Sequence, residues 1–443
     1  MIFTPWTLFV DIGLVSLLLL VGKYLRSRVK LIQRLFIPPS LLAGFAGLLL
    51  GPGVLGWLPL SGNLGTYAGI LIALVFSCIP LTSSKRESGA RSRVGRMWAY
   101  SQAGMLLQWA LGGALGLWVL SPFSSLNEAS GLSMPTGFCG GHGTAAAIGE
   151  AFSRYGVDEM LSLSMTSATV GIIASVIIGM WMITWGAAHG KTSFLSRFES
   201  LPPELRTGIL PRDKRSSMGQ ASFSAISLDS MTFNFAMVAL TALAGYGISE
   251  LVVLVWPVLK LPVFSCAFIA GLGVNGFLRR VKVEEHLSKP IIGHMSGAFT
   301  DYLVAFGVAS INLETVGRHI VSIIILLAVG LLFTALYVFF VGSRIHRDYS
   351  FEKSVFTWGW FTGTMAMGIA LLRITDPDSK SGCLDDYALA YLYIAPVEIA
   401  LVALSPVAFA YGWGWLFVTL CAVSGTAVLG MAAVKGWFKN STR

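Results

Sequence analysis

The sequence predicts an all-α polytopic membrane protein, with about eleven transmembrane helices in two inverted repeats and a re-entrant glycine-rich loop in each repeat. Three observations predict this fold. The chain has 443 residues, of which 55% are hydrophobic and 12% charged, and its mean hydropathy is +0.72. Its charge-poor stretches approach the roughly 20 residues that a bilayer-crossing helix needs. A glycine-dense run without acidic or basic residues, 137–147, lies among these stretches.

The apolar runs predict the helices, and the loop charges predict how the helices cross the membrane. We expect helices near residues 5–22, 37–52, 64–82, 97–120, 161–188, 229–250, 262–278, 292–311, 319–342, 386–409 and 412–434. With the N-terminus outside, the inner loops and the cytoplasmic C-terminal tail carry 27 of the 31 lysines and arginines. Cytoplasmic loops are rich in basic residues, which favours this orientation. The same rule explains the net charge of +9 without a nucleic-acid partner.

The number of crossings constrains two segments between the predicted helices. Residues 132–150 and 354–374 must each return to the side from which they enter, because otherwise the basic segment 189–228 would lie outside. Irregular backbone at membrane depth survives only where protein buries it or where it lines a watery cavity. These two segments are therefore predicted to be re-entrant loops that enter from opposite faces and mark the path of a ligand.

A loose internal repeat relates the two halves of the chain. Segment 37–44 resembles 261–271, and Gly143-Thr144 aligns with Gly363-Thr364. Because the first half begins outside and the second inside, the repeats are inverted, as in many secondary transporters with alternating access. We expect a first repeat over 1–188, a cytoplasmic linker over 189–228, a second repeat plus an extra C-terminal helix over 229–434, and a cytoplasmic tail over 435–443.

The two loops form the predicted substrate site. In each, glycine and threonine residues precede a short helix-prone run, and a helix N-terminus at membrane depth offers unpaired N–H donors to a carboxylate. The predicted substrate-binding residues are Gly140, Gly141, His142, Gly143, Thr144, Thr362, Gly363, Thr364 and Arg373. Thr144 is expected to cap the first helix. Alternatively, the small residues only allow close packing, His142 is a structural group rather than a proton carrier, and Arg373 anchors an inner helix end.

Oxygen-bearing side chains inside the predicted helices are the candidate cation ligands. Ionised groups are costly in hydrocarbon and usually face a cavity or a partner. The candidates are Asp301, Glu398, Thr166, Ser167 and Thr169. For the hydroxyls, the alternative is a hydrogen bond to a carbonyl of their own helix. Asp11 is assigned a scaffold role, and Glu150 with Arg154 is predicted to mark the outer rim. The five cysteines lack metal-type spacing.

Several segments carry a family resemblance. They are residues 139–147, Arg154-Tyr155-Gly156, the polar helix start at 165–171, Ile37-Pro38-Pro39, Thr362-Gly363-Thr364 and Leu371-Leu372-Arg373. Together they resemble the bacterial glutamate:sodium symporter family, most specifically in the first loop. The resemblance implies Na⁺-coupled glutamate uptake across a bacterial inner membrane, two inverted five-helix repeats, a homodimer and an elevator-like movement. The chain departs from the family at Trp360-Phe361-Thr362-Gly363, which lacks a paired glycine, and in its eleventh helix.

The leading functional hypothesis is a secondary active symporter that couples inward Na⁺ movement to uptake of glutamate or a related anionic substrate. Its partners are the substrate, Na⁺, membrane lipid and a second copy of the chain, and no cofactor is expected beyond the coupling ion. The alternative is an H⁺- or Na⁺-coupled transporter of another small carboxylate, and a more distant one is a passive channel or membrane receptor. An enzyme is disfavoured, because the chain has no HExxH, no GxSxG and no paired intramembrane aspartates.

Overall fold

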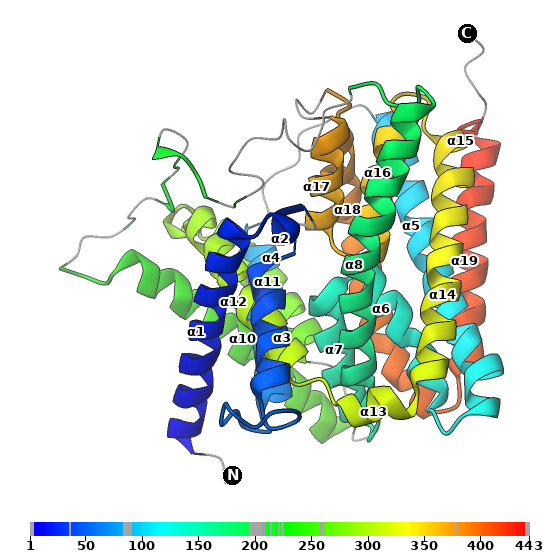
Figure 1. Cartoon of the computed structure of the whole chain (residues 1–443). Coiled ribbons are helices and arrows are strands. Elements are labelled where there is room, and N and C mark those ends of the chain that lie inside the picture. Colours follow the sequence, from blue (N-terminus) through cyan, green and yellow to red (C-terminus); the bar gives the residue numbers. More distant parts are fainter. Residues whose placement is uncertain are drawn as a thin grey trace.

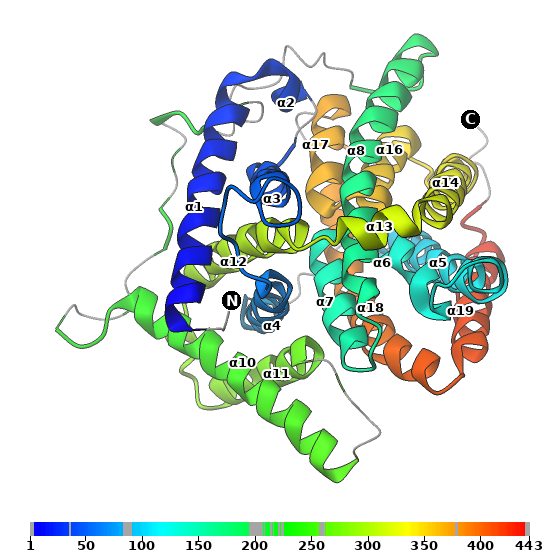
Figure 2. The same ribbon diagram turned by 60° about the horizontal axis from the view of Figure 1, so that its bottom comes forward.

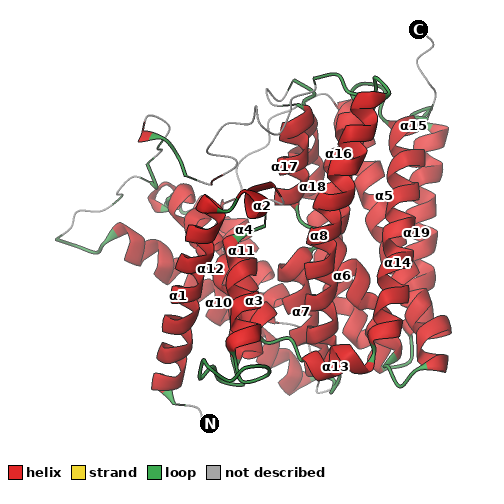
Figure 3. Cartoon of the chain, viewed as in Figure 1, coloured by secondary structure: helices red, strands yellow, loops and turns green. Residues whose placement is uncertain are grey.

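The computed structural model describes residues 4–34, 37–82, 91–194, 226–256, 261, 263–376 and 380–438, with isolated positions between 207 and 222. These residues form helices joined by loops and include no strand (Figure 3). Nine of the described helices are long and apolar enough to cross a membrane. Each of the eleven predicted segments falls on a helix. The predicted class, an all-α polytopic membrane protein, is therefore confirmed.

The helices form two groups that lie side by side (Figures 1 and 2). The first, here called the six-helix group, consists of α1 (Pro5–Arg28), α3 (Pro39–Leu50), α4 (Leu64–Thr82), α10 (Ser230–Val255), α11 (Val263–Arg280) and α12 (Lys289–Ala309). The short helix α2 (Lys30–Arg34) follows α1. Helix α13 (Leu313–Arg318) then leads from α12 across to the second group. Each half of the chain contributes three helices to the six-helix group.

The second group, here called the hairpin group, contains two helical hairpins. Its helices are α5 (Arg91–Leu115), α6 (Ser133–Cys139), α7 (Gly141–Ser153), α8 (Glu159–Ala188), α14 (Ile320–Tyr337), α15 (Ser343–Ile345), α16 (Ser350–Thr362), α17 (Met365–Thr375), α18 (Cys383–Ala410) and α19 (Gly414–Val434). The hairpin α6–α7 lies in the lower half of Figure 1, and the hairpin α16–α17 lies in the upper half. Helix α19 packs along α5.

The two hairpins meet at their tips, which are the breaks between their arms. A Cβ atom placed on Gly141 would lie 2.6 Å from Thr364 Cγ2 and 3.0 Å from the Gly363 carbonyl oxygen. Gly141 also has a φ of +61°, a left-handed conformation that favours glycine. The first tip thus needs glycine both for its backbone conformation and for its contact with the second tip.

Other glycines let the hairpins pack closely, as one of the predicted alternatives states. A Cβ on Gly359 in α16 would lie 2.6 Å from the Cα of Gly368 in α17, so the two arms touch through backbone. A Cβ on Gly137 in α6 would lie 2.5 Å from the backbone nitrogen of Ala168 in α8. Small residues permit such backbone approach between membrane helices. Close packing therefore explains Gly137, Gly359 and Gly368, which are not among the predicted site residues.

Two buried polar clusters hold the groups together internally. The carboxylate of Asp11 in α1 accepts hydrogen bonds from the Ser61 backbone N–H at 2.9 Å and from the Tyr67 hydroxyl at 3.1 Å. This geometry supports the scaffold role expected for Asp11. In the hairpin group, Lys353 of α16 and Asp386 of α18 form a buried ion pair with an N···O distance of 3.1 Å.

The second hairpin begins earlier than the sequence analysis predicted. Its first helix starts at Ser350 rather than at 354, and the second ends at Thr375. The first hairpin likewise extends to Ser153 rather than ending at 150. Lys353 was counted among the inner loop charges, but it is buried in the first turn of α16 and neutralised by Asp386. Because the charge is paired, it does not end the helical segment.

Candidate functional site

A cavity of about 420 Å³ lies between the two groups, at the hairpin tips. The six-helix group lines it with residues of α3, α4, α11 and α12, and the hairpin group lines it with residues of α7, α8, α16, α17 and α18. Of the predicted site residues, it brings together Gly140, His142, Gly143, Thr144, Thr364, Asp301 and Glu398. Residues that are far apart in the sequence, such as those of the first hairpin and of α18, therefore line the same cavity.

The first hairpin presents the start of α7 to this cavity. Helix α7 begins at Gly141, with Gly140 as its N-cap residue, so the expected cap at Thr144 is wrong. The positive φ of Gly141 turns the chain into the helix three residues before Thr144, which lies in the first turn. The first backbone N–H groups of a helix have no acceptor within it. The α7 start therefore offers N–H donors at the cavity, and Thr144 is free to donate elsewhere.

The second hairpin presents the start of α17. Thr364 is the N-cap residue, and its hydroxyl accepts a hydrogen bond from the Met367 backbone N–H at 3.4 Å. Thr362 is fully buried and donates its hydroxyl hydrogen to the Trp358 carbonyl at 2.7 Å, so it lies away from the cavity. Gly363 forms the break that contacts Gly141. Of the predicted residues at this tip, Thr364 is the one that lines the cavity.

Arg373 lies nine residues after the second tip, in the last turns of α17. At 1.5 Å per residue, its backbone is roughly 13 Å along the helix from Thr364. Its side chain lies outside the part of the structure that is described. The role predicted for Arg373 in binding a carboxylate therefore stays a prediction.

The hydroxyl candidates on α8 differ in their surroundings. Thr166 donates to the Ser162 carbonyl at 2.7 Å, and Ser167 donates to the Leu163 carbonyl at 2.9 Å. These are the intrahelical bonds that the sequence analysis gave as the alternative. Thr169 instead contacts His142, with 3.1 Å between its Oγ1 and the histidine Nε2. His142 is 2% exposed, so the observed geometry is that of a hydrogen-bonded group that fastens α7 to α8.

The two acidic candidates face the cavity from opposite groups. Asp301 comes from α12 in the six-helix group, and Glu398 comes from α18 in the hairpin group. Glu398 accepts hydrogen bonds from the Thr144 hydroxyl at 3.4 Å and from the Tyr391 hydroxyl at 3.3 Å. Both are longer than the 2.5–2.7 Å typical of a hydroxyl bound to a carboxylate. The contacts orient the carboxylate of Glu398 but compensate its charge only weakly.

Sequence reasoning missed Tyr391 and did not place Trp360 at the site. Tyr391 precedes Glu398 by seven residues, which is two helical turns, so the spacing put both side chains on one face of α18. Trp360 lines the cavity from α16 and packs against Phe361 and Tyr387, with ring centroids 4.6 and 4.9 Å apart. Trp360 stands where a paired glycine was expected from the sequence. That its side chain faces the cavity was not predicted, because this direction depends on how α16 approaches the tip.

At the end of α7, Arg154 fastens the hairpin group to the six-helix group. Its side chain forms an ion pair with Glu150 at 2.7 Å and donates to the Ser249 hydroxyl at 3.0 Å. A cavity of about 830 Å³ lies beside this contact, lined by α4, α7 and α10. Glu150 and Arg154 were predicted to mark the outer rim, and the side of the membrane on which their ion pair lies stays a prediction.

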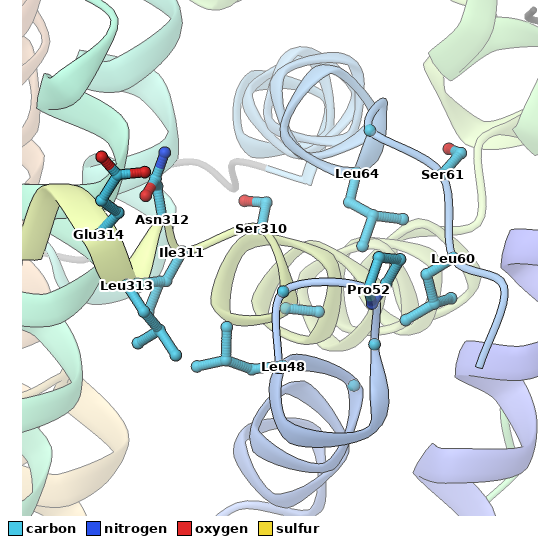
Figure 4. A pocket seen from close by; sticks show the side chains of 15 residues that line it. Leu48, Pro52, Leu60, Ser61, Leu64, Ser310, Ile311, Asn312, Leu313 and Glu314 are labelled. Atoms are coloured by element: carbon cyan, nitrogen blue, oxygen red, sulfur yellow. The ribbon is translucent and has the colours of Figure 1, made fainter. Parts of the chain in front are cut away.

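Another cavity, of about 650 Å³, lies near the start of α4 and the end of α12 (Figure 4). Its labelled side chains include Leu48, Pro52, Ser61, Asn312 and Glu314. None of the predicted site residues lines it. The cavity at the hairpin tips, where seven predicted residues converge, is therefore the candidate functional site.

The sequence profile of the sodium/glutamate symporter family matches residues 7–368, which include the six-helix group, both hairpin tips and the hairpin group as far as the first turn of α17. Helices α18 and α19 lie beyond the matched residues. Comparison with curated proteins finds no significant match. The family match agrees with the resemblance predicted from the first loop.

Proposed function

The chain belongs to the sodium/glutamate symporter family, and from this premise we propose that it takes up glutamate together with Na⁺ by an elevator-like alternating-access movement. Members of this family are transporters rather than enzymes, and Na⁺ is their coupling ion. The chain is a multi-pass membrane protein. The observation that carries the proposal is the meeting of two oppositely directed hairpin tips at a cavity between two helix groups.

Helix positions support the proposed inverted repeat. Helices α3 and α11 start 224 residues apart, at Pro39 and Val263, and α8 and α18 start 224 residues apart, at Glu159 and Cys383. A π-helical turn follows both α5 and α14, at Gly116–Leu120 and Val338–Gly342. Packing repeats as well, because α3 packs on α12 as α11 packs on α4. A duplicated unit of opposite orientation suits alternating access around a central site.

In the proposed binding mode, substrate carboxylates bind at the starts of α7 and α17. The residues that take part are Gly140, His142, Gly143, Thr144 and Thr364, and the contact of Gly141 with Gly363 holds the two helix starts together. Helix N-termini bind anions through free N–H groups and a partial positive charge. The carboxylates of Asp301 and Glu398 supply negative charge to the site, which favours the binding of a cation such as the coupling ion Na⁺.

The proposed movement displaces the hairpin group against the six-helix group. The cavity lies on the boundary between them, so a substrate held by the hairpin tips travels with the hairpin group. At this boundary α4 presents small residues to α7, and a Cβ on Gly69 would lie 3.2 Å from Glu150 Cγ. The Arg154–Ser249 hydrogen bond crosses the boundary and must break during the movement. We further propose re-entrant hairpins, an outside N-terminus, a homodimer and a bacterial inner-membrane location.

One observation favours a second candidate, transport of another small carboxylate. At the position where the first tip has its paired glycines, the second hairpin has Trp360 and Phe361, both buried. A bulky aromatic side chain at the cavity restricts the length of the substrate. A shorter carboxylate would fit the smaller space.

Uptake by purified protein in liposomes tests the proposed function. Labelled glutamate should accumulate against its gradient when Na⁺ is imposed outside, and unlabelled glutamate should compete. A proton gradient without Na⁺ is the control for the coupling ion. Accumulation that follows the proton gradient alone, or equilibration without accumulation, would contradict Na⁺-coupled symport. Competition by a shorter carboxylate, with none by glutamate, would identify the second candidate.

A further inference from the structure

The charges around the cavity at the hairpin tips are unusual for a site that takes an anion. The described residues that line it include the two carboxylates of Asp301 and Glu398 and no lysine or arginine. Among the residues that line the cavity, the helix starts are therefore the groups that attract an anionic substrate, and two side chains are acidic. A ligand that also carries a positive charge would satisfy both the helix starts and the carboxylates.

Glu398 and the start of α7 lie next to each other. Thr144 is in the first turn of α7, and its hydroxyl is 3.4 Å from Glu398 Oε1. The positive end of a helix and a carboxylate are thus separated by about one hydrogen bond. An α-amino acid carries its ammonium and carboxylate groups on one carbon, so it can place the carboxylate at the α7 start and the ammonium group beside Glu398 at the same time.

We propose that Glu398 binds the ammonium group of the substrate, so that the transporter selects α-amino acids over carboxylates that lack an amine. This inference rests on the proposed function, because it assigns the substrate to the cavity at the hairpin tips. In this arrangement the α-carboxylate lies at the α7 start and the ammonium group replaces the weak contact of the Thr144 hydroxyl with Glu398. Tyr391, at 3.3 Å from Oε2, orients the carboxylate toward the cavity.

The two acids then have different roles because they belong to different groups. Glu398 is in the hairpin group with both helix starts, so it stays with the substrate throughout the proposed movement. Asp301 is on α12 in the six-helix group and contacts the cavity only where the groups are placed as they are here. A group that recognises the substrate must travel with it, which assigns the ammonium to Glu398 rather than to Asp301.

Binding of matched ligand pairs tests the inference. Glutamate and glutarate differ only by the amine, as do aspartate and succinate, and each is titrated into purified protein in Na⁺ while thermal stabilisation is measured. Removing one partner of a buried charge pair costs enough to weaken binding by about 30-fold or more. The parent protein should prefer the amino acid of each pair by that factor. E398Q should abolish the preference, because it weakens binding of the amino acid while the deaminated acid, which loses a negative neighbour, binds at least as well as to the parent.

Two variants and one further titration make the result specific. E398D keeps the charge and should retain the preference for the amine, whereas D301N should leave the preference unchanged. The Na⁺ concentration for half-maximal stabilisation should be the same in E398Q and the parent. An E398Q variant that needs more Na⁺ but keeps its amine preference would overturn the inference and make Glu398 a cation ligand. An amine preference in the aspartate pair, with no binding of glutamate, would refute the proposed function and support the inference.

Discussion

Replacing Gly141 with alanine tests whether transport depends on the contact between the two hairpin tips. The left-handed conformation of Gly141, with φ +61°, costs a residue with a Cβ atom about 1 kcal/mol. The new Cβ would also lie 2.6 Å from Thr364 Cγ2 and 3.0 Å from the Gly363 carbonyl oxygen. Carbon atoms in contact are normally about 3.5–4.0 Å apart. The tips must therefore separate by about 1 Å, because the second neighbour is backbone and cannot rotate away.

Gly156→Ala is the matched control for this substitution. Gly156 has a φ of +80°, and a Cβ placed on it meets no atom within 4 Å. It therefore carries the same backbone cost without the contact between the tips. Both variants should lose a few degrees of thermal stability through the backbone, and G141A should lose more because its Cβ also forces the tips apart.

The two variants should differ in transport. A displacement of about 1 Å in positioned groups costs roughly 100-fold, so G141A should lose about that factor in Na⁺-driven glutamate uptake, while G156A stays near the parent. Initial rates in liposomes, corrected for the amount of inserted protein, measure the difference. Equal uptake rates in G141A and G156A would refute the argument that the tips must touch.

Three further predictions follow from the hairpin group. D386N leaves the charge of Lys353 buried without its partner and should lower the free energy of unfolding by about 3–5 kcal/mol, measured by thermal unfolding. The double variant K353M/D386L removes both charges and should recover most of this loss. Equal stability of D386N and the parent would contradict the prediction. W360A removes an aromatic wall of the cavity, so 2-aminoadipate, one methylene longer than glutamate, should compete better with glutamate uptake than in the parent. Single cysteines at Ser125 and Asp158 should react with an impermeant thiol reagent from the same side, as a re-entrant first hairpin requires, and reaction from opposite sides would exclude it.

The positions of the helices could be predicted from the sequence because long apolar runs separated by basic loops leave few alternatives. The eleven predicted segments fall on helices even where a helix continues past the apolar run, as in α5, which starts at Arg91 rather than at 97. The hairpin tips were also predictable, since Gly140 and Gly363 interrupt otherwise helical stretches. Local composition determines these features, and so they can be read from one sequence.

The charge environment of the site could be predicted only in part. Asp301 and Glu398 were identified because acids within apolar helices are costly, but their placement on opposite groups depends on how distant helices pack. Thr144 was expected to cap a helix, yet it donates to Glu398, 254 residues away in the sequence. No local pattern reports such a contact. Lys353 was misplaced for the same reason, because its partner Asp386 lies on another helix.

The two tips are related by the proposed repeat but differ in what they present to the cavity. The first tip presents mainly backbone, because Gly140 and Gly143 line the cavity and have no side chains. The second presents side chains, because Trp360 lies on the cavity wall beside Thr364. In the proposed binding mode, backbone N–H groups bind the carboxylate that all substrates of this class share, whereas the aromatic wall distinguishes substrates by length. We therefore expect substitutions at the first tip to weaken every substrate alike and those at Trp360 to change the preference among them.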